Sequence, residues 1–223
     1  MDKYHIYLIS GMGLDERLFF KMEINAPNIH HLNWIEPLPK EDIEDYARRM
    51  MQQIEHRGNI ILIGVSFGGM MAIELSKILR VEQVIIISSI KQKEELPVLM
   101  KIGKYFPVYY FTTPKMRQNF RRVWGRLFGL FSQEAVEFFD DMFEKNSPKY
   151  KTWAVNRISN WQNETYPKNL VHIHGTKDKI FPIKKIQNAI IIEGGTHGMI
   201  VNRAEEVSQY VNKILQNFVA NRA

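Results

Sequence analysis

The chain has 223 residues, 45% of them hydrophobic, which fits one globular domain with a large core rather than two domains. It contains no cysteine, which excludes disulfides, thiolate metal sites and a cysteine nucleophile. The net charge is +6 and the excess is local, because residues 91–131 hold nine Lys or Arg against two Asp or Glu. This distribution indicates a surface that meets something acidic rather than a uniformly basic nucleic-acid-binding protein.

Neither a membrane span nor a secretion signal is expected. No run of about 18 apolar residues occurs, so no transmembrane segment is predicted. The amino-terminal residues Met1-Asp2-Lys3 carry an acid and are followed by no apolar signal core. This pattern predicts a cytoplasmic protein.

Strand and helix patterns alternate over the first ninety residues. Short apolar runs predict strands over residues 3–10, 29–35, 59–63 and 83–88. Apolar residues that recur on one stripe predict helices over residues 41–56 and 67–79. The first strand ends at Gly11-Met12-Gly13, which predicts a glycine-rich loop.

The alternation stops at Ser89 and returns after about Tyr166. The stretch between is aromatic and basic, contains several prolines and is typical of a helical insertion. Beyond it, strands are predicted over residues 170–174 and 189–192, with a short helix over 182–187 and a long one over 199–218. The sum is an α/β fold of about six mostly parallel strands with one helical insert.

The sequence Gly64-Val65-Ser66-Phe67-Gly68 joins a predicted strand to a predicted helix. A serine between two glycines at this spacing suits a sharp strand-to-helix turn, where small flanking residues let strand and helix come close. The serine side chain would then stand exposed at the end of the strand. The motif predicts a nucleophile at Ser66.

Two further strand ends carry residues that a serine nucleophile needs. Asp178 follows the strand over 170–174, and His197 follows the strand over 189–192. A serine hydroxyl needs a base, and an imidazole needs a carboxylate that fixes its tautomer. Since the carboxyl ends of parallel strands share one edge of a sheet, we expect Ser66, Asp178 and His197 to meet there.

These motifs together resemble the α/β-hydrolase superfamily. The matching segments are Ile9-Ser10-Gly11-Met12-Gly13, Gly64-Val65-Ser66-Phe67-Gly68-Gly69, His174-Gly175-Thr176-Lys177-Asp178 and Gly195-Thr196-His197. The resemblance implies that Ser66 is the nucleophile, His197 the general base and Asp178 the orienting acid. It also implies that the backbone N–H groups of Met12 and Phe67 form the oxyanion hole.

The resemblance implies the three-layer α/β-hydrolase fold. Residues 1–90 and 167–223 would form the discontinuous core, and residues 91–166 a helical lid inserted after the strand that ends near Ser88. The chain departs from the family at two points. Ser10-Gly11 stands where the family usually has His-Gly, and the chain starts directly at what would be the third strand of the family.

Other polar residues have plainer interpretations. Asp15 is expected to cap a turn or short helix. His30 and His31 are expected on a solvated strand or loop. His172 and His174 lie two apart on one strand and project to the same side, an arrangement that can bind metal, but packing under the Asp178 loop is the expected role.

Four arginines in the insert form a candidate docking surface: Arg117, Arg121, Arg122 and Arg126. Their spacing places them on roughly one side of a predicted helix, with apolar residues interleaved. They fit a solvated outer face of the lid, a docking surface for an acidic partner or an anionic substrate group, or contact with a membrane surface. The acidic residues that follow within 134–144 offer internal partners.

The resemblance implies a serine hydrolase that cleaves a small-molecule carboxylic ester or thioester through an acyl-Ser66 intermediate. Such a reaction is expected to require no metal or organic cofactor. Three alternatives stay open: an esterase whose acyl chain is carried by an acidic acyl carrier protein, a lyase or carbon–carbon bond hydrolase, and a non-catalytic ligand-binding module. The sequence does not predict the natural substrate or the oligomeric state.

Overall fold

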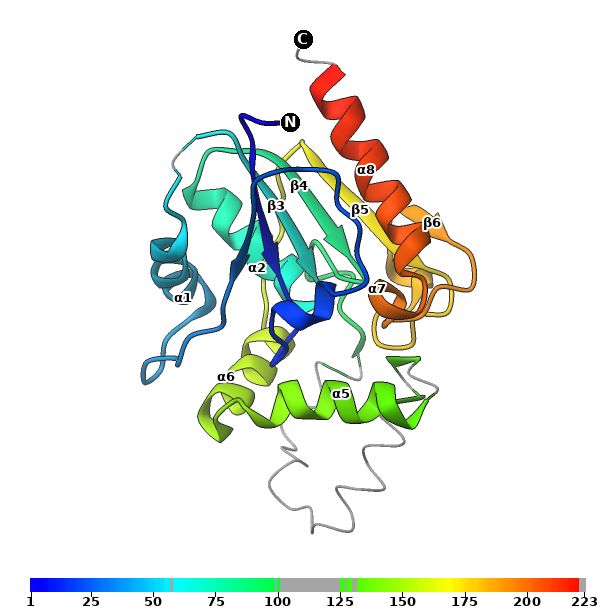
Figure 1. The fold of residues 1–223 in the computed structure, drawn as a ribbon. Coiled ribbons are helices and arrows are strands. Elements are labelled where there is room, and N and C mark those ends of the chain that lie inside the picture. The colour runs from blue at the N-terminus through cyan, green and yellow to red at the C-terminus, as the bar shows by residue number, and fades with distance from the viewer. Residues whose placement is uncertain (57, 99, 101–124, 127, 130–131, 221–223) are drawn as a thin grey trace.

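The computed structural model describes residues 1–56, 58–98, 100, 125–126, 128–129 and 132–220. These residues form a six-stranded sheet flanked by helices (Figure 1). The strands are β1 (His5–Ile9), β2 (Ile29–Leu32), β3 (Ile60–Val65), β4 (Val81–Ile87), β5 (Leu170–Gly175) and β6 (Ile190–Ile192). Their order is β2-β1-β3-β4-β5-β6 and every pair is parallel, so the predicted α/β class and sheet are confirmed.

Helices cover both faces of the sheet (Figure 1). The α-helices of the described residues are α1 (Ile43–Met50), α2 (Phe67–Ile78), α5 (Gln133–Glu144), α6 (Pro148–Ser159), α7 (Met199–Asn202) and α8 (Ala204–Ala220). Short 3-10 helices are η1 (Glu16–Phe19), η2 (Met51–Gln53) and η4 (Ile183–Lys185). No helix among the described residues is both long and apolar enough to span a bilayer.

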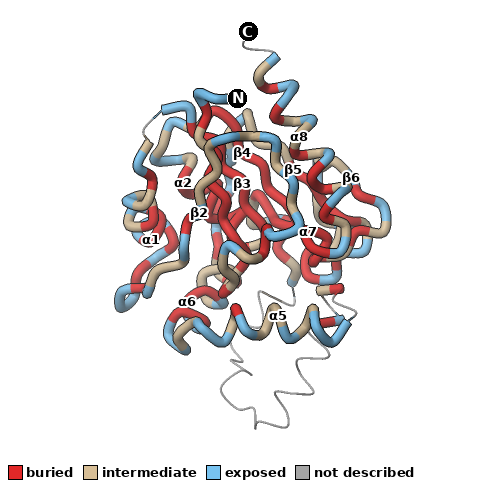
Figure 2. The backbone as a smooth tube through the Cα atoms, in the orientation of Figure 1, coloured by how far each residue is buried: buried red, intermediate tan, exposed pale blue. Residues whose placement is uncertain are grey.

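Two hydrophobic cores lie on opposite faces of the sheet, because successive strand residues point to opposite sides. Tyr7 and Ile9 pack with residues of α1, α2 and α6. Ile6 and Leu8 pack with residues of η1, α7 and α8. The central strands are therefore buried along their length, as Figure 2 shows, which is why they appear in the sequence as continuous apolar runs.

The helix predicted over residues 199–218 is interrupted. α7 ends at Asn202 and α8 begins at Ala204, because Arg203 leaves the helical conformation with φ −135° and ψ 35°. The Arg203 guanidinium donates to the carbonyl of Glu193 and pairs with Glu206. The apolar periodicity continues across this break, which explains why the pattern predicted a single helix.

α5 and α6 lie beyond the carboxyl ends of the strands (Figure 1). Both begin at a serine whose side chain accepts a backbone N–H of the first turn, Ser132 for α5 and Ser147 for α6. Trp153 of α6 stacks on Tyr46 of α1 with ring centroids 4.1 Å apart, which anchors α6 to the core. Both helices fall within the stretch predicted as an insertion, and residues 101–124 of that stretch lie outside the described residues.

Candidate active site

Ser66 lies at a sharp turn between β3 and α2. Its backbone has φ 54° and ψ −119°, a conformation that is costly for a residue other than glycine. The flanking glycines permit the turn, since a Cβ at Gly64 would overlap the carbonyl of Gly68, and a Cβ at Gly68 would overlap the carbonyls of Ile9 and Ser10. The turn is further held by the Ser89 hydroxyl, which donates to the Ser66 carbonyl at 2.6 Å.

The structure brings Ser66, His197 and Asp178 into one hydrogen-bonded chain. The Nε2 atom of His197 lies 3.0 Å from the Ser66 Oγ, and its Nδ1 atom lies 2.8 Å from the Asp178 Oδ2. His197 and Asp178 are buried, and Ser66 is partly exposed. The three residues follow β6, β5 and β3, so the shared carboxyl edge of the sheet assembles them.

Asp178 is held as a carboxylate. Burial raises the pKa of Asp178, but the neighbouring His197, through its charge and its hydrogen bond, together with His174 and the Phe181 N–H, brings the pKa below its usual value. The Oδ1 atom accepts from the N–H groups of Ile180 and Phe181, both at 2.8 Å. A carboxylate only accepts, so the Nδ1 atom of His197 carries the proton and its Nε2 lone pair faces Ser66.

His172 and His174 lie behind the Asp178 loop, where packing was predicted. The Nε2 atom of His174 donates to the Phe181 carbonyl at 2.8 Å. Its Nδ1 atom is then an acceptor, and the His172 Nε2–H donates a hydrogen bond to it at 3.2 Å. Burial lowers the pKa of both imidazoles, with smaller contributions from neighbouring charges. Both rings are therefore neutral supports of the loop that carries Asp178.

The loop after β1 lies beside Ser66. A Cβ built at Gly11 would be 3.7 Å from the Cβ of Ser66. The Ser10 hydroxyl donates to the Leu14 carbonyl at 2.6 Å and accepts from Trp34 Nε1 at 3.2 Å. Trp34 also donates to the Gly11 carbonyl at 3.0 Å. Ser10, which replaces the usual histidine of the resembled family, thus fixes the shape of this loop through its hydroxyl.

The two predicted oxyanion donors, the backbone N–H groups of Met12 and Phe67, belong to the segments that meet at this edge of the sheet. Within the described residues, neither the Met12 N–H nor the Phe67 N–H donates to another protein group. Met12 belongs to the loop beside Ser66, and Phe67 directly follows Ser66. Register pairs Ile9 with Gly64, so the loop after β1 and the turn after β3 start side by side.

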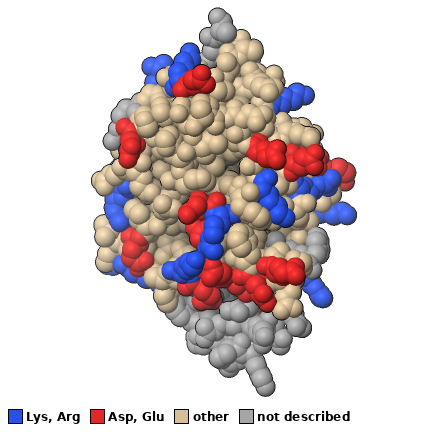
Figure 3. All heavy atoms as spheres, viewed as in Figure 1, with Lys and Arg blue, Asp and Glu red and all other residues tan. Residues whose placement is uncertain are grey.

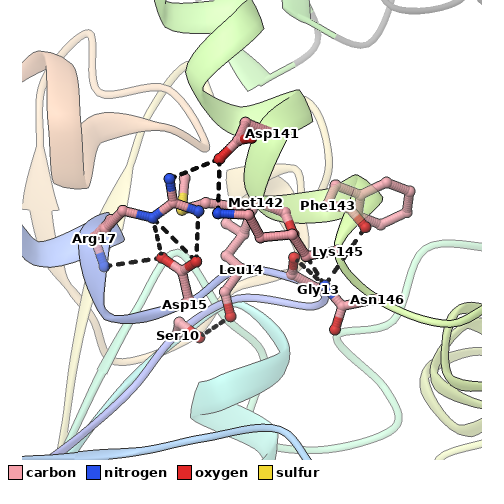
Figure 4. Close-up of polar contacts among 10 residues, drawn as sticks. All are labelled: Ser10, Gly13, Leu14, Asp15, Arg17, Asp141, Met142, Phe143, Lys145 and Asn146. Atoms are coloured by element: carbon pink, nitrogen blue, oxygen red, sulfur yellow. Dashed lines mark hydrogen bonds and ion pairs between the residues drawn. The ribbon is translucent and has the colours of Figure 1, made fainter.

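The turn between α5 and α6 and the first part of α6 bond the loop after β1; Figure 4 shows the contact made by Asn146 of that turn. The Asn146 amide donates to the Gly13 carbonyl at 2.8 Å, and the Gly13 N–H donates to the Tyr150 hydroxyl at 3.3 Å. Gly13 has φ +71°, and a Cβ there would strike the Phe143 ring. Residues from the predicted insert therefore bond both the N–H and the carbonyl of Gly13.

An ion-pair network surrounds this contact (Figure 4). Arg17 bridges Asp15 at 2.6 Å and Asp141 of α5 at 2.7 Å, and Lys145 pairs with Asp141 at 3.0 Å. Arg17 and Lys145 lower the pKa of Asp141 through hydrogen bonds and charge. Asp15 also accepts the Arg17 N–H at the start of η1, which confirms its predicted capping role.

The arginines of the predicted docking surface are mostly outside the described residues. Arg117, Arg121 and Arg122 lie there, and Arg126 is described and exposed. On the face seen in Figure 3, cationic and anionic side chains are interspersed. Of the acidic residues of α5, Asp141 pairs with Arg17 and Lys145, and Glu144 pairs with Lys151.

Phe128 is a site neighbour that the sequence did not indicate. Its ring meets the His197 ring edge-on at 5.0 Å between centroids, and its carbonyl accepts the Gly198 N–H at 2.7 Å. Phe181 approaches His197 from another side, at 5.5 Å. These contacts enclose the imidazole in apolar surroundings. An aromatic residue inside a predicted insertion carries no signal that it will reach a distant histidine.

Fold and site together define a hydrolase. A family model described as the Alpha/beta hydrolase family matches residues 7–210, so the chain belongs to that family. No curated protein matches the chain in sequence.

Solved structures share the fold at low sequence identity. A provisionally assigned lipase (lip1) of Acinetobacter baumannii AYE has a TM-score of 0.75 and 14% identity, over 98% of this chain and 85% of its own. A bromoperoxidase of Bacillus anthracis has a TM-score of 0.70 and 18% identity, over 96% and 93%. A thermophilic esterase of Thermogutta terrifontis has a TM-score of 0.63 and 16% identity, over 97% and 91%. Their different activities show that this fold does not determine the substrate.

Proposed function

We propose that the protein is a carboxylic ester hydrolase that acts through an acyl-Ser66 intermediate. The observation that carries the proposal is the hydrogen-bonded chain from Ser66 Oγ through His197 to Asp178. A serine hydroxyl within reach of an imidazole whose other nitrogen is held by a carboxylate is the arrangement that activates serine toward a carbonyl carbon.

In the first half-reaction, His197 Nε2 takes the proton of Ser66 Oγ as the oxygen attacks the ester carbonyl. The tetrahedral oxyanion accepts hydrogen bonds from the N–H groups of Met12 and Phe67. The imidazolium then returns its proton to the departing alcohol, the carbon–oxygen ester bond breaks, and acyl-Ser66 remains.

In the second half-reaction, His197 takes a proton from water, and the resulting hydroxide attacks acyl-Ser66. The Ser66 oxygen leaves with the proton from His197, which restores the free enzyme and releases the acid. Asp178 stays ionised throughout, because its Oδ1 atom remains bonded to the Ile180 and Phe181 N–H groups while Oδ2 faces the imidazolium.

The contacts of Gly13 support the assignment of Met12 to the oxyanion hole. Asn146 and Tyr150 bond the carbonyl and N–H of the residue directly after Met12. Stabilisation of an oxyanion depends on donors that are fixed before the reaction. We infer that Asn146, in the turn between α5 and α6, and Tyr150 of α6 hold the Met12 N–H in place.

The test is a Ser66→Ala variant assayed against p-nitrophenyl esters of increasing acyl length, with matching thioesters in parallel. We expect the variant to lose turnover and labelling by a fluorophosphonate probe. Ser76→Ala is the matched control, because Ser76 lies on the same helix and, in the part of the chain that the structure describes, its hydroxyl bonds only the local Ile73 carbonyl, at 2.7 Å. Undiminished turnover in Ser66→Ala would refute the mechanism.

A further inference from the structure

Three histidines far apart in the sequence gather at the end of β1 opposite Ser66. His5 is the first residue of β1, His30 lies on β2, and His56 follows η2. Each side chain is partly buried, so the group is reachable from solvent. The cluster belongs neither to the Ser66 chain nor to the loop that carries Asp178.

The ring nitrogens of the cluster converge. His5 Nδ1 and His30 Nε2 lie 3.1 Å apart, and one nitrogen from each of the three rings lies within 4.8 Å of the other two. The His56 ring stacks on His5 with centroids 3.5 Å apart and planes inclined by 12°. Among the described residues, this is the group of three ligand-type side chains that meets the distances of a metal site.

The 3.1 Å pair has the spacing of two ligands on one ion. Zinc binds imidazole nitrogen at about 2.0–2.1 Å in tetrahedral geometry, which puts two such nitrogens about 3.3 Å apart. Two neutral imidazoles that face each other share a single proton between their nitrogens. An ion can take the place of that proton with a shift of a few tenths of an ångström.

Tyr7 supplies an outer partner for the third ring. Its hydroxyl lies 3.1 Å from His56 Nδ1 and accepts the His56 backbone N–H at 3.4 Å. A ligating histidine commonly donates its second ring N–H to such a partner, which fixes the tautomer. With Nδ1 held by Tyr7, Nε2 is the His56 nitrogen left for an ion.

We propose that His5, His30 and His56 form a binding site for zinc or a similar late divalent transition metal. Three imidazole nitrogens and no carboxylate suit such ions rather than calcium or magnesium, which take oxygen ligands. The His56 ring turns out of its stack on His5 to aim at the ion, since parallel rings cannot direct lone pairs to one point. The torsion involved has a broad minimum, and a water completes the tetrahedron.

The position of the cluster in the fold fits this role. The ligands come from β1, β2 and the segment that leads into β3. An ion there joins the three elements at the edge of the sheet, so the proposed role is to stabilise the fold, and it does not rest on the proposed esterase activity.

The experiment is a titration of the tag-free protein with Co²⁺ and Zn²⁺. Co²⁺ bound by three imidazoles and water shows visible absorption typical of tetrahedral nitrogen ligation, and Zn²⁺ displaces it. We expect one equivalent per chain, and a rise in melting temperature of several degrees at saturating Zn²⁺. His56→Gln should weaken Zn²⁺ binding at least tenfold.

His31→Gln is the matched control, because His31 adjoins His30 in sequence but is exposed and outside the cluster. It should bind Zn²⁺ like the wild type. A triple variant in which His5, His30 and His56 are replaced by Gln keeps His31, His172, His174 and His197, so it measures Zn²⁺ binding elsewhere. The proposal would be overturned if the wild type bound Zn²⁺ no more tightly than this variant. It would also be overturned if His31→Gln weakened Zn²⁺ binding as much as His56→Gln does. The Co²⁺ spectrum of the wild type tests it even where a variant does not fold.

Discussion

Removal of one hydroxyl tests whether α6 positions the proposed oxyanion loop. In Tyr150→Phe the ring stays in the core, where Tyr150 is 2% exposed, but the buried Gly13 N–H loses its acceptor at 3.3 Å. An unsatisfied buried donor costs about 1–3 kcal/mol, and the long bond places this case near the lower end. If the loop that carries Met12 shifts to relieve this cost, the transition state loses a similar amount of stabilisation, and kcat falls about 5- to 20-fold.

The assay compares kcat and KM for a p-nitrophenyl ester with stability in urea. We expect kcat to fall while KM changes little, because the Met12 N–H acts on charge that develops in the transition state. Tyr7→Phe is the control. Tyr7 is also buried, its hydroxyl accepts the His56 backbone N–H at 3.4 Å, a bond of similar length to that of Gly13, and His56 lies at the end of the sheet opposite Ser66.

Tyr7→Phe should therefore lose stability and keep its kcat. A Tyr150→Phe enzyme with kcat within twofold of the wild type would refute the reasoning. So would equal losses of kcat in the two variants, because the effect would then follow general destabilisation rather than the position of the loop.

Three further predictions follow from the site and its supports. Asp178→Asn keeps the shape of the side chain but removes the charge that fixes His197, so kcat should fall on the order of 10⁴-fold in the same ester assay. Gly68→Ala forces a methyl group against the end of β1 and should lower both urea stability and kcat, by about 1–3 kcal/mol in stability, whereas Gly58→Ala meets no atom within 4 Å and should do neither. His172 and His174 have lowered pKa values when folded, so the unfolded chain binds more protons below pH 6.5 and stability should fall from pH 7 to pH 5, with His172→Gln reducing the slope.

Much of the fold could be predicted because the apolar runs and the glycine positions that determine it are visible in short stretches of sequence. β3 and β4 are buried along their length, so their sequences are continuous apolar runs that few other structures produce. Gly64 and Gly68 flank Ser66 because only hydrogen fits where β3, α2 and β1 meet. The order of Ser66, Asp178 and His197 on successive strand ends then implied that the three would share an edge, and their hydrogen-bond distances agree with that expectation.

The features that could not be predicted depend on contacts between distant segments. The break at Arg203 follows from its reach to the Glu193 carbonyl, while the local apolar pattern continues through it. Ser10 differs from the usual family residue, and only the position of Trp34 shows how its hydroxyl steadies the loop. Phe128 reaches His197 from a stretch whose composition indicated only an insertion.

The histidine cluster shows why such sites escape motif searches. A zinc motif places its ligands a few residues apart on one turn or helix, so its spacing is visible in sequence. His5 and His30 instead meet because β1 and β2 pair in register, with His30 opposite Tyr7. His56 joins them because η2 ends just before the chain returns to β3. Parallel strand pairing can therefore bring together ligands whose separation in sequence depends on the lengths of the connecting segments. Such a set can be identified only once the strand order is known.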